Sequence, residues 1–177
     1  MKKFLLVQLV VVAAGCATPQ RELPTQPGVD LQLYAGTWHE QARLPNRFQA
    51  GCVGDVQAEY TLQTDGTLKV VNQCRLQDGS VRQVEGEGRL AGPSEGADPS
   101  RLEVRFAPAW TSWLPMVWGD YWIIRQDDYQ YSLVGTPDRK YLWVLSREKD
   151  ADATKVQALL DHAGSLGFAV EDVIRVP

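Results

Sequence analysis

The sequence predicts an all-β fold, an eight-stranded up-and-down antiparallel barrel with one amphipathic helix packed outside it near the C-terminus. Two observations predict it. Short stretches of alternating apolar and polar residues recur between turn signals, and a single helical period follows the last of them. The 177 residues, 44% of them hydrophobic, suit one folded domain. A closed eight-stranded barrel leaves no free sheet edge and holds one small ligand.

Residues 1–15 are predicted to be a lipoprotein signal peptide. Two lysines precede an apolar run over residues 4–14, which is too short to span a bilayer. The run ends in Ala-Ala-Gly before Cys16, an ending that resembles the bacterial lipobox, whose cysteine becomes the lipidated first residue. An ordinary cleaved signal or a buried strand are the alternatives. Ala17 in place of Asp resembles the pattern of delivery to the outer membrane, where palmitate-like chains on Cys16 would anchor the domain.

Residues 16–29 are expected to be a lipidated tether, because the stretch after Cys16 is rich in Pro, Gln and Thr and has no hydrophobic period. The folded domain is then expected over residues 30–177. In an oxidising compartment a disulfide is the simplest use of Cys52 and Cys74. A free structural pair and a reactive thiol are the alternatives. A metal site is not expected, since there is no C-x-x-C and the two histidines are far apart.

The strands follow in order from these alternations. Val56 to Leu62 alternate with polar neighbours, a turn stands at residues 64–66, and the alternation resumes at Leu68. A second turn at residues 78–79 leads to a strand over 81–90, in which two glycines allow the bend that barrel closure needs. After a Gly/Pro loop at 91–100, further strands are expected at 101–106, 118–125, 129–136 and 141–147.

The one helix is predicted after the last of these strands. Its apolar residues fall at helical spacing, and Asp150 or Asp152 is expected to cap its start, with Gly164 at its end. The buried face is Val156, Leu159, Leu160 and Ala163.

The charge balance argues against one class of partner. The chain carries 18 Lys and Arg against 22 Asp and Glu, a net charge of −4. Loss of the two leader lysines makes the mature chain more negative still. Nucleic acid is therefore not an expected partner, because phosphate binding needs a basic surface.

Three motifs in order resemble those of the lipocalins. Residues 33–48 contain a Gly-x-Trp like the first lipocalin motif, Asp128-Tyr129-Gln130-Tyr131 resembles the second, and residues 141–147, Tyr-Leu-Trp-Val-Leu-Ser-Arg, resemble the third. With the leader, the chain looks most like the bacterial outer-membrane lipoprotein lipocalins related to apolipoprotein D. It departs from that pattern in two places: the second motif lacks its usual Thr, and the loop before Trp118 is long and rich in Trp.

The resemblance implies a structural closed end built from Gly36, Trp38 and Arg147. Trp38 is expected at the base of the barrel with Arg147 over its ring, a cation–π contact. These residues are expected to seal the barrel, not to bind ligand.

Alternation from these fixed points predicts the ligand-binding side chains. From Arg147, Leu145 and Trp143 point inward. Counting back from the turn at residues 128–129 gives a second inward set of Ile124, Trp122 and Asp120, with Trp118 at the mouth. From Trp38, two first-strand residues point inward. The complete predicted set is Glu40, Ala42, Trp118, Trp122, Ile124, Trp143 and Leu145.

Glu40 places a carboxylate in an apolar interior, where an isolated charge is expensive. Two uses are open. It contacts a ligand headgroup, or it holds Arg43 or a tyrosine hydroxyl in a structural network. A catalytic use is not expected.

The resemblance puts the open end at the loops over residues 45–52, 77–80, 107–117 and 137–140. The third loop is strongly apolar for a loop, and exposed patches of that kind usually mark a contact surface. Its portal residues are Trp110, Trp113, Leu114 and Met116. We expect a lid or membrane-touching portal; a plug that fills the mouth and a homodimer contact are the alternatives.

These expectations describe a membrane-anchored, non-enzymatic protein without cofactor that carries, stores or scavenges fatty acids, lysophospholipids or similar apolar ligands. The outer membrane, reached through lipidated Cys16, is the expected location. The alternative is an envelope interaction or structural lipoprotein with a plugged barrel, which uses its Trp-rich loop to bind a partner. No Ser-His-Asp, metal or phosphate motif supports catalysis.

Overall fold

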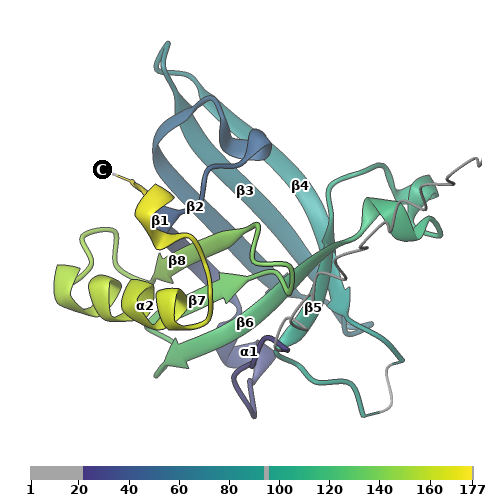
Figure 1. Cartoon of the computed structure of the whole chain (residues 1–177). Helices are drawn as coiled ribbons and strands as arrows, with labels where there is room; N and C mark the ends of the chain where they lie inside the picture. Colours follow the sequence, from purple (N-terminus) through teal and green to yellow (C-terminus); the bar gives the residue numbers. More distant parts are fainter. Residues whose placement is uncertain (1–21, 94–95, 177) are drawn as a thin grey trace, which may run out of the picture.

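The computed structural model describes residues 22–93 and 96–176, and these form a closed antiparallel barrel (Figure 1). The predicted eight-stranded barrel is confirmed, because β1 pairs with both β2 and β8. A short extra strand, β9, pairs with β1 and was not predicted. The strands are β1 Gly36–Arg43, β2 Cys52–Leu62, β3 Leu68–Leu76, β4 Val81–Leu90, β5 Arg101–Arg105, β6 Gly119–Asp127, β7 Tyr131–Gly135, β8 Leu142–Ser146 and β9 Ile174–Arg175.

Two α-helices and four single-turn 3-10 helices accompany the strands in the described residues. The first α-helix, α1, lies at one end of the barrel, and the second, α2, lies across the outside of β7 and β8 (Figure 1). The bounds are α1 Leu31–Tyr34, α2 Ala153–Ser165, η1 Arg47–Gln49, η2 Ala109–Thr111, η3 Pro115–Val117 and η4 Val170–Asp172.

Helix α2 confirms the predicted buried face and cap. The side chain of Asp152 accepts the amide hydrogen of Thr154 at 2.8 Å. The prediction that Gly164 ends the helix is wrong: α2 runs to Ser165, and the left-handed residue is Gly167, at φ +90°. Gly164 is instead a close-packing position, since a Cβ there would stand 3.2 Å from Val170 Cγ2.

The segment before α1 is part of the fold. Leu23 is fully buried, the Gln26 amide donates to the Ile123 carbonyl at 2.9 Å, and the Thr25 hydroxyl donates to Asp98. A start of the folded part at residue 30 is therefore too late, because residues 22–29 pack along β6. Residues 1–21, with the predicted signal peptide and Cys16, lie outside the described residues.

Buried apolar side chains form two separate clusters, one on each side of the barrel wall. The inner cluster fills the lower barrel and includes Tyr34, Trp38, Tyr60, Tyr121 and Leu145. The outer cluster lies between the wall and α2 and includes Ala42, Ile124, Leu133, Val144 and Leu159. Which cluster a strand residue joins shows which way its side chain points.

Candidate functional site

The closed end is sealed as predicted. Trp38 is fully buried, and the guanidinium carbon of Arg147 lies 3.9 Å from the centre of its ring. Arg147 also donates hydrogen bonds to the carbonyls of Leu33, Ala35 and Thr37 at 2.8–2.9 Å. One guanidinium therefore holds the end of α1 and the start of β1 against the ring, as a planar five-donor group can.

Above this seal lies a row of four hydroxyl groups. The Tyr60 and Tyr121 hydroxyl oxygens are 2.8 Å apart, Tyr121 and Tyr34 are 3.2 Å apart, and Tyr34 lies 2.9 Å from the hydroxyl of Ser132. Burial raises the pKa of Tyr34 to about 12 and raises the pKa values of Tyr60 and Tyr121 as well. All three phenols therefore keep their protons at neutral pH.

A cavity of about 720 Å³ opens above the tyrosines to the far end of the barrel. This volume falls within the roughly 300–1,000 Å³ of small-molecule sites. Its lower wall carries Tyr60, Tyr121, Val70, Asn72, Ala58 and Leu145, and its rim carries Arg47, Phe48, Arg82, Phe106, Met116 and Tyr141. Three of the four predicted open-end loops contribute to the lining; residues 77–80 do not.

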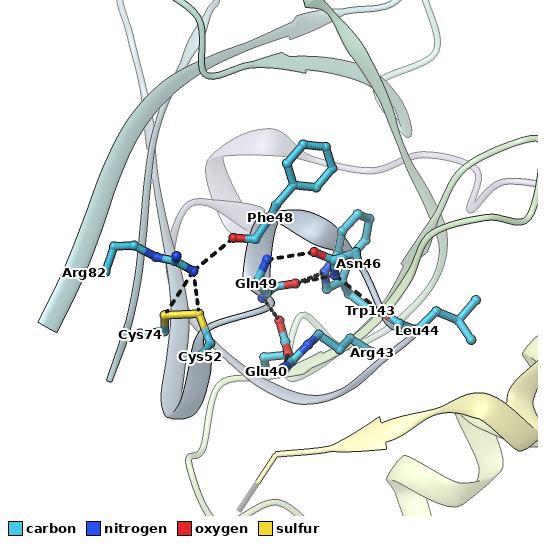
Figure 2. A network of polar contacts seen from close by, with 10 residues as sticks. All are labelled: Glu40, Arg43, Leu44, Asn46, Phe48, Gln49, Cys52, Cys74, Arg82 and Trp143. Carbon is cyan, nitrogen blue, oxygen red and sulfur yellow. Dashed lines mark hydrogen bonds and ion pairs between the residues drawn. A yellow bond between two sulfur atoms is a disulfide. The ribbon is translucent and has the colours of Figure 1, made fainter. Parts of the chain in front are cut away.

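Glu40 lies on the cavity wall within a closed polar network (Figure 2). Arg43 Nη1 donates to Glu40 Oε1 at 2.7 Å, and Gln49 Nε2 donates to Glu40 Oε2 at 2.5 Å. Gln49 Oε1 in turn accepts from Trp143 Nε1 at 3.0 Å and from Asn46 Nδ2 at 2.7 Å. Of the uses left open by the sequence, the structure shows the pairing with Arg43.

Burial raises the pKa of Glu40, against the opposing effects of Gln49 and Arg43. Both of its oxygens are occupied by protein donors, and its side chain is only 4% exposed. Glu40 thus ties η1 to the wall of the barrel, with one protein donor on each of its oxygens.

Four of the seven predicted ligand-binding side chains line the cavity: Glu40, Trp118, Trp143 and Leu145. The inward placement of Ala42, Trp122 and Ile124 is wrong. Ala42 and Ile124 belong to the outer cluster. Trp122 packs against that cluster under Arg101, whose guanidinium carbon lies 4.6 Å from the ring centre.

The three misplacements have the same kind of cause, a β-bulge in β1 and another in β6. In β1, Glu40 faces Leu145 and Ala42 faces Val144, so Gln41 is an extra residue in the register. In β6, Ile123 faces Val134 and Arg125 faces Leu133, so Ile124 is extra. An extra residue reverses the alternation beyond it. The inward residues of β6 are therefore Tyr121 and Ile123.

The predicted disulfide is confirmed. Cys52 and Cys74 are bonded and join β2 to β3 beside the cavity rim. Arg82 Nη2 lies 3.2 Å from the Cys52 sulfur and donates to the Phe48 carbonyl at 3.0 Å (Figure 2). The disulfide and Arg82 therefore hold the start of β2 and η1 at the mouth.

The loop over residues 107–117 holds its aromatic side chains outward. Trp110 and Trp113 are 76% and 75% exposed, Met116 is 85% exposed, and Leu114 is half-buried. Trp118 anchors the end of the loop, because its Nε1 donates to the Ser112 carbonyl at 2.8 Å. The guanidinium carbons of Arg89 and Arg105 lie 3.8 Å and 5.1 Å from the centre of its ring. Of the four portal residues, only Met116 reaches the cavity lining.

Two further findings concern residues 22–93 and 96–176 only. No group of three or more His, Cys, Asp or Glu side chains there is arranged to hold a metal ion. No helix in this part of the chain combines the length and the hydropathy that a membrane span requires.

Comparison with known proteins decides the family. The lipocalin-like domain family matches residues 29–177. The chain belongs to the lipocalin family. Among its lipocalin relatives, temperature-induced lipocalin-1 of Arabidopsis thaliana is 35% identical over 162 residues, which cover 90% of this chain and 85% of the relative. Outer membrane lipoprotein Blc of Escherichia coli (strain K12) is 35% identical over 169 residues, covering 94% and 89%.

More distant lipocalins agree. Apolipoprotein D of Mus musculus is 30% identical over 163 residues, covering 88% of this chain and 78% of the relative. Insecticyanin from the tobacco hornworm Manduca sexta has a TM-score of 0.69 at 20% identity, covering 89% and 85%, and supports the lipocalin fold alone. Lipocalins are generally ligand-binding carriers, and the cavity is the part of this lipocalin suited to a small hydrophobic ligand.

Sequence reasoning missed several of the residues that shape the lipocalin cavity. Tyr60 stands in the alternating run of β2, so its inward direction could be predicted, but its hydroxyl partner, Tyr121 on β6, could not. Asn72 and Arg82 lie on β3 and β4 among other polar residues. The alternation of Leu68 and Val70 extends to Asn72, but nothing local marks Arg82 as a residue that lines the cavity.

Proposed function

We propose that this lipocalin carries or scavenges fatty acids, lysophospholipids or similar single-chain lipids in its barrel cavity. The cavity supports this proposal above all. It is open at one end, its walls are mostly apolar, and its volume is that of a site for one small molecule. A lipid chain against such walls gains about 25 cal/mol for each Å² of apolar surface that it buries, without a covalent bond to the protein.

The charges at the rim support an anionic headgroup. Arg47 is exposed and Arg82 half-buried, and both line the mouth. A carboxylate or phosphate at the rim would meet two guanidinium groups while its chain lies below. The acidic groups of the rim, Asp120 and Asp138, stand on the other side of the barrel, on β6 and in the β7–β8 connection.

The anchor and the Trp-rich loop complete the proposal. Lipidation of Cys16 would hold the domain at the outer membrane, by analogy with the Escherichia coli relative, outer membrane lipoprotein Blc. Trp110, Trp113 and Met116 would then enter the interfacial layer of that membrane, where Trp is favoured. The alternative of a plugged barrel is disfavoured, because the loop points outward and the cavity below it is empty of side chains.

Native mass spectrometry with lipid extraction tests the proposal. The chain from residue 17 onward keeps every described residue and is expressed in a bacterial periplasm. We expect one single-chain lipid per barrel, and the same spectrum gives the number of barrels per particle. A folded, oxidised protein that is empty and refuses added palmitate and lysophospholipid would contradict the carrier proposal.

The portal is tested separately on anionic vesicles. Replacing Trp110 and Trp113 together with Ala should weaken vesicle binding and slow lipid transfer while leaving lipid affinity unchanged. Leu33→Ala is the matched control, since Leu33 is 57% exposed at the closed end. In cells, Cys16→Ser should release the protein from the membrane fraction. Unchanged vesicle binding by the double variant would exclude the loop from membrane contact.

A further inference from the structure

The four hydroxyl groups above the closed end carry one proton more than the hydrogen bonds between them use. Tyr60, Tyr121, Tyr34 and Ser132 form a linear row with three contacts, and each contact uses one proton. Four hydroxyls carry four protons, so one O–H must point elsewhere. Tyr34 and Ser132 are fully buried, and within residues 22–93 and 96–176 neither hydroxyl has another side-chain or backbone partner. A spare proton on either would therefore be a costly unpaired donor.

Tyr60 and Tyr121 are the two members of the row that line the cavity. The spare O–H therefore belongs to one of these two and points into the cavity. Because burial raises the pKa values of both phenols, the donor stays protonated at neutral pH. The floor of the cavity thus presents a permanent hydrogen-bond donor beside two phenol oxygens that also accept.

A second unsatisfied group lies one layer higher. Asn72 lines the cavity, and its Oδ1 is buried without a hydrogen-bond partner in the part of the chain that the structure describes. In the β2–β3 register Tyr60 faces Val70 and Ala58 faces Asn72, so Tyr60 and Asn72 are diagonal neighbours on the inner face. Rotation about χ2, which is broad for Asn, brings either end of the amide toward the cavity.

We propose that the deep end of the cavity recognises a hydroxyl group at the far end of the bound chain, so that the preferred ligand is an ω-hydroxylated acyl chain. A hydroxyl both donates and accepts, and it would satisfy the tyrosine donor and the Asn72 amide together. A carboxylate does not fit there, because the hydroxyl row offers no cation, whereas the rim offers Arg47 and Arg82. This inference rests on the proposed function and adds the chemistry of the buried end.

Palmitic acid and ω-hydroxypalmitic acid are the probes, since they differ only in the terminal hydroxyl. Their affinities for the delipidated chain from residue 17 onward are measured by calorimetry. We expect the hydroxylated acid to bind roughly three- to tenfold more tightly, the fold-change of about one net hydrogen bond. Two variants should abolish that preference: Asn72→Leu, and Tyr60→Phe combined with Tyr121→Phe. Both substitutions are needed, because either one alone leaves the spare proton on the other tyrosine.

Gln83→Leu is the matched control, because Gln83 is an exposed amide on β4 that does not line the cavity. It should keep the preference, and circular dichroism checks that each variant folds. Equal binding of the two acids by the wild-type protein, or an unchanged preference in both cavity variants, would overturn the inference and leave the carrier proposal intact. If the folded wild-type protein binds neither acid, the carrier proposal fails and the inference fails with it.

Discussion

Gly36 lies directly against Arg147 at the closed end of the barrel. A Cβ at Gly36 would stand 3.2 Å from Arg147 Nη1, and the residue adopts φ +98°, a conformation that side chains disfavour. The glycine therefore serves two purposes. It turns the chain from α1 into β1, and it lets the guanidinium reach the carbonyls on both sides of that turn.

Gly36→Ala should lower the free energy of unfolding by roughly 2–4 kcal/mol, the sum of a strained backbone and a displaced guanidinium. Gly66→Ala is the control, since Gly66 has φ +84° and open space around its Cβ position. Urea denaturation of both variants separates the two contributions. An equal loss at the two sites would mean that contact with Arg147 contributes nothing.

Trp38→Ala should cost about 3–5 kcal/mol, as for other buried aromatic truncations. Trp38 is fully buried and its Nε1 donates to the Tyr34 carbonyl at 2.8 Å, so both packing and a hydrogen bond are lost. Arg147→Lys should cost less, because it keeps the charge but loses the planar fork. Thermal unfolding followed by circular dichroism measures both, and an unchanged melting temperature for the Trp38 variant would refute its sealing role.

The order of strands could be predicted because it depends on local signals. Alternation, turns and one helical period identify each element, and short antiparallel connections leave few topologies. The disulfide and the pairing of Trp38 with Arg147 could also be predicted, the latter because the motifs of a known family contain both residues. The packing of residues 22–29 along β6 could not, since only Leu23 and Val29 are buried in a stretch that otherwise reads as a linker.

The prediction of which way side chains point failed where a bulge interrupts the alternation. Leu145 and Trp143 are two and four residues before Arg147, the register of β8 with β7 has no bulge, and their inward direction was predicted correctly. Ala42 and Trp122 were counted across the bulges at Gln41 and Ile124, which reverse the count. Nothing in these sequences marks a bulge, because it follows from the bend that the closed barrel requires.

The disulfide should contribute about 3 kcal/mol of stability. Cys52 and Cys74 are 22 residues apart, and a cross-link of that span restricts the unfolded chain by an amount of this order. Replacing both cysteines with Ala should lower the denaturation midpoint, and reductant should lower that of the wild type but not that of the variant. A reductant effect on the double variant would show that the loss has another origin.

Glu40 should give the folded chain a measurable dependence on pH. Burial raises its pKa in the fold above the ordinary value of a glutamate side chain. Between the unfolded and the folded pKa the folded state therefore binds more protons than the unfolded state. By linkage, the contribution of Glu40 to stability is largest below that window and declines as the pH rises through it.

Glu40→Gln isolates this effect, because the other titrating groups are common to both proteins. The free energy of unfolding of each is measured in urea from pH 4 to pH 8. We expect the advantage of the wild type over the variant to shrink as the pH rises. An advantage that grows with pH would mean that the ion pair with Arg43, at 2.7 Å, outweighs burial and that the pKa of Glu40 is lowered in the fold. The sign of the slope of this stability difference against pH thus decides which has the larger effect on the pKa of Glu40: burial, or the ion pair with Arg43.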